Sequence, residues 1–251
     1  MAVGIYPHAP IAEELPHPPI SIAVHLVIEQ ALRKAWELML SKPRENFDLA
    51  AAVEDDITFE LHRRLKDEVL KYGLVPGFNR QVLGDVVREP KVDNYDQSSL
   101  DKMPDLLVLF ASEYRPTVFR PSQDGVFIEC KPVDSVHPAG KVYCDKGVIR
   151  FISGEYAWAM TSAMMVAYAH PGYAINLKLA EALAARAKSM PIKSPPAPCA
   201  RSTAYDIAEV VHVTQHERAF IYPANGMAAP PIALRHLWLR RCQAKSPEIN
   251  A

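Results

Sequence analysis

The chain has 251 residues, of which 49% are hydrophobic and 23% charged, and its formal net charge is −1. This composition is typical of a globular protein that buries a substantial core, in one domain with elaborations. The near-zero charge argues against a free-standing protein that binds nucleic acid non-specifically, because such proteins usually carry a basic surface.

The four cysteines are scattered along the chain and predict neither a zinc site nor a disulfide framework, which fits a reducing cytosol. The proline-rich stretch from Met1 to Pro19 lacks the basic start and apolar run of a secretory signal. The apolar run from Tyr156 to Ala169 has about 14 residues, whereas a membrane span needs about 20. We therefore expect a buried core helix there and a cytoplasmic protein. A membrane-associated protein is the weaker interpretation, because the longer stretch that it requires, Tyr156 to Leu177, contains a proline and a glycine.

Two helices are expected before the first strand. Ser21 to Ser41 carries an apolar stripe, with Ser21 as its N-cap and Pro43 beyond its end. The second helix is expected from Phe47 to Tyr72. Its apolar residues recur every four positions, at Ile57, Leu61, Leu65 and Val69.

Three strands are predicted next. They cover Val75 to Val87, with a turn at Gly84-Asp85, then Met103 to Ala111, and then Gly125 to Val133. The glycines around Val142 to Ile152 favour a hairpin. Two further helices are expected, at Glu155 to Tyr168 and at Ile175 to Ala187.

The last third is expected to be β-rich. Met190 to Ser202 holds four prolines and is predicted to be a surface connection. Three strands are expected between Tyr205 and Arg241, around Ile207 to Val213, Arg218 to Tyr222 and Ile232 to Leu239, with a turn at Asn225-Gly226. The expected organisation is an N-terminal proline-rich segment and helix (1–46), a main domain (47–241) and a tail (242–251).

Two predicted strands carry acidic residues and a lysine at one end. Pro104-Asp105 opens the second strand, and Glu129-Cys130-Lys131 closes the apolar part of the third. Residues two apart in a strand point to the same side, so Glu129 and Lys131 share a face. This arrangement can bring two carboxylates and an amine to one edge of a sheet. The purely structural alternative is that Glu129 and Lys131 form a surface ion pair at a strand end and that Asp105 merely starts a strand.

These residues resemble the motif of the PD-(D/E)XK nuclease superfamily, the restriction-endonuclease-like proteins, over about Ala50 to Tyr168. The resemblance implies an α/β fold with a core of helix, three strands, helix and strand. It implies that Asp105 and Glu129 bind Mg²⁺, for which Mn²⁺ can substitute, with the backbone carbonyl of Cys130 as a further ligand. It also implies that Lys131 is catalytic and that the first core helix supplies a glutamate. Glu54 is the choice for that glutamate, and Glu60 the reserve.

The chemistry agrees with these residue types. A divalent ion lowers the pKa of its bound water and stabilises the charge that develops on a phosphate, and Mg²⁺ prefers oxygen ligands. Lys131 could orient the water, deprotonate it, or hold the scissile phosphate. Four basic residues are candidate phosphate contacts: Lys141, Arg150, His216 and Arg218.

The expected function is therefore Mg²⁺-dependent phosphodiester hydrolysis by an endonuclease, with DNA as the expected substrate. The resemblance implies a homodimer or a subunit of a larger complex, in bacterial defence or repair. The alternative is a non-catalytic assembly or nucleic-acid-docking subunit that keeps the fold. Such a subunit is expected to lose one of the three motif residues, and Asp105, Glu129 and Lys131 are all present.

Overall fold

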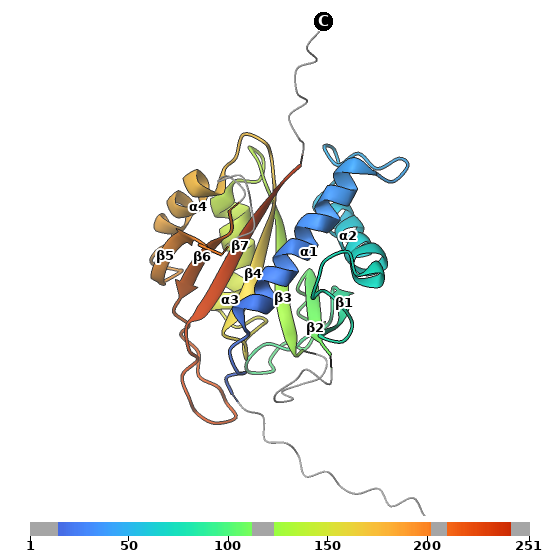
Figure 1. Cartoon of the computed structure of the whole chain (residues 1–251). Helices are drawn as coiled ribbons and strands as arrows, with labels where there is room; N and C mark the ends of the chain where they lie inside the picture. The colour runs from blue at the N-terminus through green and yellow to red at the C-terminus, as the bar shows by residue number, and fades with distance from the viewer. Residues whose placement is uncertain (1–14, 112–122, 202–209, 242–251) are drawn as a thin grey trace, which may run out of the picture.

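The structure, a computed structural model, describes residues 15–111, 123–201 and 210–241. These residues form a mixed α/β fold around one seven-stranded sheet (Figure 1). Its strands are β1 (Leu83–Arg88), β2 (Leu106–Phe110), β3 (Gly125–Val133), β4 (Ser162–Ala169), β5 (Ile192–Pro198), β6 (His212–His216) and β7 (Ile232–Arg240). Their order across the sheet is β1-β2-β3-β4-β7-β6-β5.

The sheet has a parallel centre and antiparallel flanks. β1, β2 and β3 pair antiparallel in sequence order, β3, β4 and β7 run parallel, and β7, β6 and β5 are again antiparallel. Every residue of β3 and of β4 is buried. Parallel strands at the centre of a sheet are covered on both faces, which is why these two strands are almost continuously apolar.

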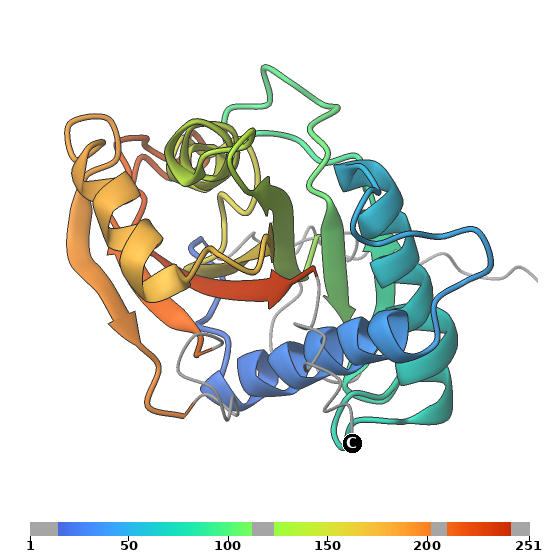
Figure 2. The ribbon, with the colours of Figure 1, turned by 90° about the horizontal axis from the view of Figure 1, so that it is seen from above.

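Helices cover both faces of the sheet, as the view from above shows (Figure 2). On one face lie α1 (Ile22–Ser41), α2 (Glu54–Arg64) and the π-helical η1 (Leu65–Leu70) that continues α2. On the other lie the π-helical η3 (Ala139–Val148), α3 (Ile149–Ile152) and α4 (Ile175–Ala184). Alternate strand residues point to opposite faces and so enter different hydrophobic clusters: Ile128 and Met164 pack under α1 and α2, and Phe127 and Met165 pack under η3.

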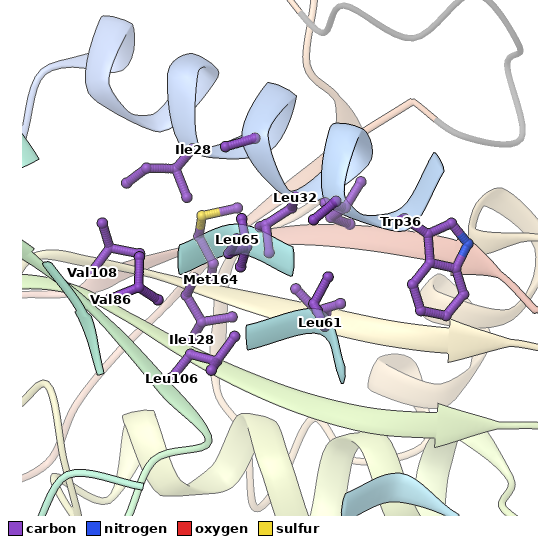
Figure 3. Close-up of a cluster of buried hydrophobic side chains, with 14 of the residues drawn as sticks. Ile28, Leu32, Trp36, Leu61, Leu65, Val86, Leu106, Val108, Ile128 and Met164 are labelled. Carbon is purple, nitrogen blue, oxygen red and sulfur yellow. The ribbon is translucent and has the colours of Figure 1, made fainter. Parts of the chain in front are cut away.

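The predicted N-terminal helix is confirmed and belongs to the main core. Ser21 caps α1, its side-chain oxygen accepting the N–H of Val24. Ile28, Leu32 and Trp36 of α1 point toward the sheet and meet the side chains of α2, η1, β1, β2, β3 and β4 (Figure 3). The Trp36 indole N–H donates to the Arg240 carbonyl at 2.7 Å, which ties α1 to β7.

A buried ion pair also joins α1 to the sheet. Glu29 is fully buried, and its carboxylate accepts the Nε of Arg235 in β7 at 2.5 Å. Arg235 is 5% exposed. A charged pair removed from water in this way depends on both partners being present.

The expected helix from Glu155 to Tyr168 is wrong. Residues 162–169 instead form strand β4, between β3 and β7. A short apolar run does not by itself distinguish a buried helix from a parallel strand that is covered on both faces.

Two predicted features between the strands are also wrong. The hairpin expected from Val142 to Ile152 is the helical segment η3–α3. The surface connection expected from Met190 to Ser202 contains β5, which pairs with β6 at the edge of the sheet. An edge position tolerates the prolines of β5, because one side of an edge strand makes no ladder hydrogen bonds.

The remaining predicted elements differ from the structure mainly in where they begin and end. The second helix begins at Glu54 rather than Phe47. Gly84-Asp85 is an irregularity within β1 rather than a turn. Of the expected strand from Arg218 to Tyr222, only an isolated bridge between Ile221 and Ala228 forms. The predicted strand cores in β2, β3 and β7 and the helix α4 are confirmed. The predicted tail, 242–251, and part of the strand expected around Ile207 lie outside the described residues.

Among the helices of the described ranges, none has the length and apolar character needed to cross a membrane.

Candidate functional site

The candidate site lies where β2 separates from β3. Their pairing runs from Leu109 with Gly125 to Leu106 with Ile128 and ends there, whereas β3 continues to Val133 beside β4. At this point the side chain of Asp105, just before β2, bonds to the backbone of β3. Its Oδ2 accepts the backbone N–H of Cys130 at 2.6 Å, in place of a further strand-to-strand bond.

The Lys131 ammonium collects oxygens from three elements of the fold. Its Nζ lies 2.6 Å from Glu54 Oε1, 3.3 Å from Asp105 Oδ2 and 2.8 Å from Glu129 Oε1. It also donates to the backbone carbonyl of Cys130 at 2.8 Å. Four oxygens that the sequence analysis had singled out therefore converge on one cation.

The structure distinguishes between the two glutamates of the second helix. Glu54 is the first residue of α2 and lies at the opening between β2 and β3. Glu60 instead accepts hydrogen bonds from Arg63 and Arg64 of its own helix. The choice of Glu54 over Glu60 agrees with this geometry.

The site is closed on one side and open on the other. The Glu129 side chain is fully buried and that of Lys131 is 8% exposed, whereas the side chains of Asp105 and Glu54 are 17% and 28% exposed. The interpretation of Glu129 and Lys131 as a surface ion pair is therefore wrong. Solvent, and hence a ligand, approaches from the side of Glu54 and Asp105.

Burial and crowding shift the protonation of the site. Burial, together with the nearby Asp105 carboxylate, raises the pKa of Glu129 to about 7 against the opposing effect of Lys131. Burial also raises the pKa of Glu54, again opposed by Lys131. For Lys131, burial lowers the pKa, but the carboxylates of Glu129, Asp105 and Glu54 outweigh it and raise the pKa overall. Lys131 is thus an ammonium at neutral pH in this arrangement, which favours holding a phosphate or orienting water over deprotonating water.

Two further residues hold Glu129. The Tyr156 hydroxyl donates to Glu129 Oε2, and Arg150 Nη1 donates to Glu129 Oε1 at 3.2 Å. Sequence reasoning missed Tyr156, because it placed this residue in a helix. No local pattern singles it out; the available signal is that a buried tyrosine hydroxyl usually has a hydrogen-bond partner.

The four candidate phosphate contacts have different surroundings. Arg150 contacts Glu129, and its side chain is 35% exposed; Lys141 is exposed on η3. The structure argues against the other two candidates, His216 and Arg218, as phosphate contacts. His216 is fully buried and bonds to Thr214, and Arg218 is buried and donates to backbone carbonyls, including that of Trp158. Because both side chains are buried and hydrogen-bonded to interior partners, neither presents its polar groups to a phosphate at the surface.

A glycine lets η3 approach the two motif residues of β3. A Cβ placed on Gly147 would lie 2.6 Å from the Met165 Cε, 3.4 Å from Lys131 Cγ and 3.6 Å from Glu129 Cγ. The first of these separations is a clash and the other two are ordinary contacts. The missing side chain of Gly147 therefore allows close packing of η3 over the site.

Replacing Gly147 by alanine is expected to destabilise the protein by about 1 kcal/mol. The new methyl group must displace the end of the flexible Met165 side chain in a packed core, and the higher helix propensity of alanine offsets part of that cost. Thermal unfolding would register this as a fall in Tm of about 2–4 °C. Adding Met165→Leu removes the clashing Cε and is expected to recover the loss. A Tm that is no higher in the double variant than in the single variant would show that Met165 does not oppose the methyl group.

The oxygen set suits a hard divalent cation, because three carboxylates and a carbonyl are ligands that Mg²⁺ accepts. In the ranges that the structure describes, no three His, Cys, Asp or Glu side chains are grouped at metal-binding geometry. The Lys131 ammonium is the cation at the point where the oxygens converge. The donor chemistry therefore fits such an ion, and the ammonium would compete with it for the same oxygens.

Comparison of the chain with protein-family models, with curated proteins and with solved structures gives no match.

Proposed function

We propose that this protein is a metal-dependent nuclease that hydrolyses phosphodiester bonds, with DNA as its substrate. The observation that carries the proposal is the convergence of Glu54, Asp105, Glu129 and the Cys130 carbonyl on one buried cation. Three separate elements supply these oxygens, at a point where two strands part and solvent can enter. Such a set of carboxylates at the end of a hydrophobic strand is costly unless a cation neutralises it.

The order of the elements supports a restriction-endonuclease-like core. α2 is followed by the antiparallel strands β1, β2 and β3, then by the helical segment η3–α3, and then by β4 parallel to β3. This is the helix, three strands, helix and strand that the resemblance to the PD-(D/E)XK superfamily implies. The motif residues lie on β3 and next to the start of β2.

The proposed roles follow from the positions of the side chains. Glu54, Asp105, Glu129 and the Cys130 carbonyl would hold Mg²⁺ or Mn²⁺. When bound, the ion would supply an activated water and charge stabilisation at the phosphate. Lys131 would hold the scissile phosphate or orient the water, and the partly exposed Arg150 would contact a phosphate beside it. Because the chain's net charge is only −1, the attraction for a nucleic-acid backbone would come from the bound ion together with Lys131 and Arg150.

One observation favours a second candidate, a non-catalytic docking subunit with the same fold. The Lys131 ammonium occupies the point of convergence, so the cluster could be a closed network of ion pairs. Direct binding of Mn²⁺ distinguishes the two candidates, because a closed network would bind none.

The test is cleavage of supercoiled plasmid DNA, with RNA in parallel, in Mg²⁺, Mn²⁺ or EDTA. Wild-type protein is expected to cut only with a divalent ion. Asp105→Asn is expected to slow cutting on the order of 100-fold or more, because it weakens both the ion site and the bond to the Cys130 N–H.

Asp134→Asn is the matched control. Asp134 follows β3 and also accepts backbone N–H groups, from Val136 and His137, but it makes no contact with Lys131. Its rate is expected to stay within a few-fold of the wild-type rate. Cutting in EDTA, or equal rates for Asp105→Asn and wild type, would remove the proposed function.

A further inference from the structure

Tyr156 is a buried residue beside the candidate site, in the segment between α3 and β4. It is 1% exposed, and its hydroxyl donates to Glu129 Oε2. The hydroxyl is therefore the donor and the Glu129 carboxylate the acceptor of this hydrogen bond.

The two oxygens of Glu129 have different partners. Oε2 is bonded to Tyr156, whereas Oε1 contacts Lys131 Nζ at 2.8 Å and Arg150 Nη1 at 3.2 Å. Oε1 is thus the oxygen that faces the point shared with Glu54 and Asp105. With Oε2 held at the back, the carboxylate cannot rotate freely about its terminal bond.

Tyr156 is itself held in place from two sides. Its ring packs edge-on against Phe151, with ring centroids 5.2 Å apart and an interplanar angle of 85°. The Arg150 guanidinium lies over the ring, 6.0 Å from its centroid, and Nη1 of the same residue lies 3.3 Å from the Tyr156 hydroxyl. A donor whose ring is packed in this way can fix the orientation of the group that it bonds.

We propose that Tyr156 is a positioning residue that holds Glu129 Oε2 so that Oε1 is presented to a divalent cation together with Glu54 and Asp105. The inference rests on the proposed function for the identity of the cation. Nothing in the motif assigns this role, because Tyr156 lies outside both halves of it. Groups that orient a metal ligand by hydrogen bonding commonly change metal affinity when they are removed.

The experiment measures Mn²⁺ affinity directly, by the electron paramagnetic resonance signal of the free ion, in wild type and in Tyr156→Phe. This substitution removes only the hydroxyl. It is expected to weaken Mn²⁺ binding by about 10-fold or more. Cleavage of plasmid DNA is expected to need a correspondingly higher Mn²⁺ concentration.

Tyr143→Phe is the matched control. Tyr143 is also fully buried, and its hydroxyl lies 2.9 Å from His236 Nδ1 rather than bonding a residue of the site. Tyr143→Phe removes a buried hydroxyl of the same kind but leaves the hydrogen bonds of Glu129 intact. The Mn²⁺ affinity of this variant should therefore stay within about twofold of wild type. Equal weakening in both variants would mean a general loss of packing and would overturn the inference.

A double-mutant cycle with Glu129→Gln shows whether the effect of Tyr156→Phe on Mn²⁺ affinity acts through Glu129. Once the carboxylate is gone, Tyr156→Phe should have no further effect on Mn²⁺ affinity, and independent, additive effects would overturn the inference. Binding that is present but unchanged in Tyr156→Phe overturns the role of Tyr156 alone. Absence of Mn²⁺ binding in wild type overturns the proposed metal site, and the role of Tyr156 with it.

Discussion

Replacing Lys131 by alanine is expected to slow nucleic-acid cleavage roughly 1,000-fold and, at the same time, to tighten Mn²⁺ binding. The two effects have one cause. The ammonium lies within 3.3 Å of oxygens from Glu54, Asp105 and Glu129, so it neutralises these carboxylates and competes for them. Without the ammonium, the metal ion binds these oxygens with no competitor. The reaction also loses the positive charge that would stabilise the phosphate.

Both quantities are measured at about pH 8.5, above the pKa of Glu129, which is about 7 in the presence of Lys131. The pH matters because Lys131 lowers the pKa of Glu129, so the alanine variant holds its carboxyl proton to a higher pH. Mn²⁺ affinity follows from a titration, and the cleavage rate from conversion of supercoiled plasmid at saturating Mn²⁺.

Lys146→Ala is the control, because Lys146 is an exposed lysine on η3, in the helix that packs over the site. It should leave both quantities unchanged. Equal cleavage rates for Lys131→Ala and wild type would remove Lys131 from the catalytic assignment. Loss of cleavage together with weaker Mn²⁺ binding would contradict the competition between ammonium and metal.

The largest expected effect on stability comes from the buried pair of Glu29 and Arg235. Glu29→Met is expected to lower the free energy of unfolding by about 3–5 kcal/mol, because it leaves the Arg235 guanidinium buried without its carboxylate. Urea denaturation followed by circular dichroism measures the loss, which should appear in the midpoint rather than in the slope.

The double variant Glu29→Met/Arg235→Met is expected to regain most of the lost stability, since it removes the second charge as well. Glu37→Met is the control on the same helix: Glu37 pairs with Lys34 at the surface, and losing such a pair costs at most about 1 kcal/mol. If Glu29→Met costs no more than Glu37→Met, the pair does not anchor α1 to β7.

Local pattern was sufficient where a residue's role depends on its own strand or helix. The run from Gly125 to Val133 predicted β3 with the bounds that the structure has, and the two-residue period placed Glu129 and Lys131 on one face. Ser21, followed by an apolar stripe, predicted α1 and its cap. In both cases the signal lies within a few residues of the feature.

Local pattern was insufficient where the structure of a segment depends on elements that are distant in the sequence but adjacent in the fold. Residues 162–169 form a strand because β3 and β7 lie on either side of them, and the apolar sequence alone allowed a helix. Tyr156 escaped notice for a related reason: its partner, Glu129, is brought to it by the packing of the η3–α3 segment over β3.

The sequence by itself determined which residue types could bind a cation, and that Glu129 and Lys131 share a side of their strand. The tertiary structure decided which helical glutamate joins them: at 3.6 residues per turn, Glu54 and Glu60 point in different directions from one helix, and only the docking of α2 brings Glu54 to Lys131. It also decided that β2 leaves β3 at Leu106, which opens the space where the oxygens meet. Periodicity specifies the face of an element, whereas the meeting of two elements depends on contacts between residues far apart in the chain.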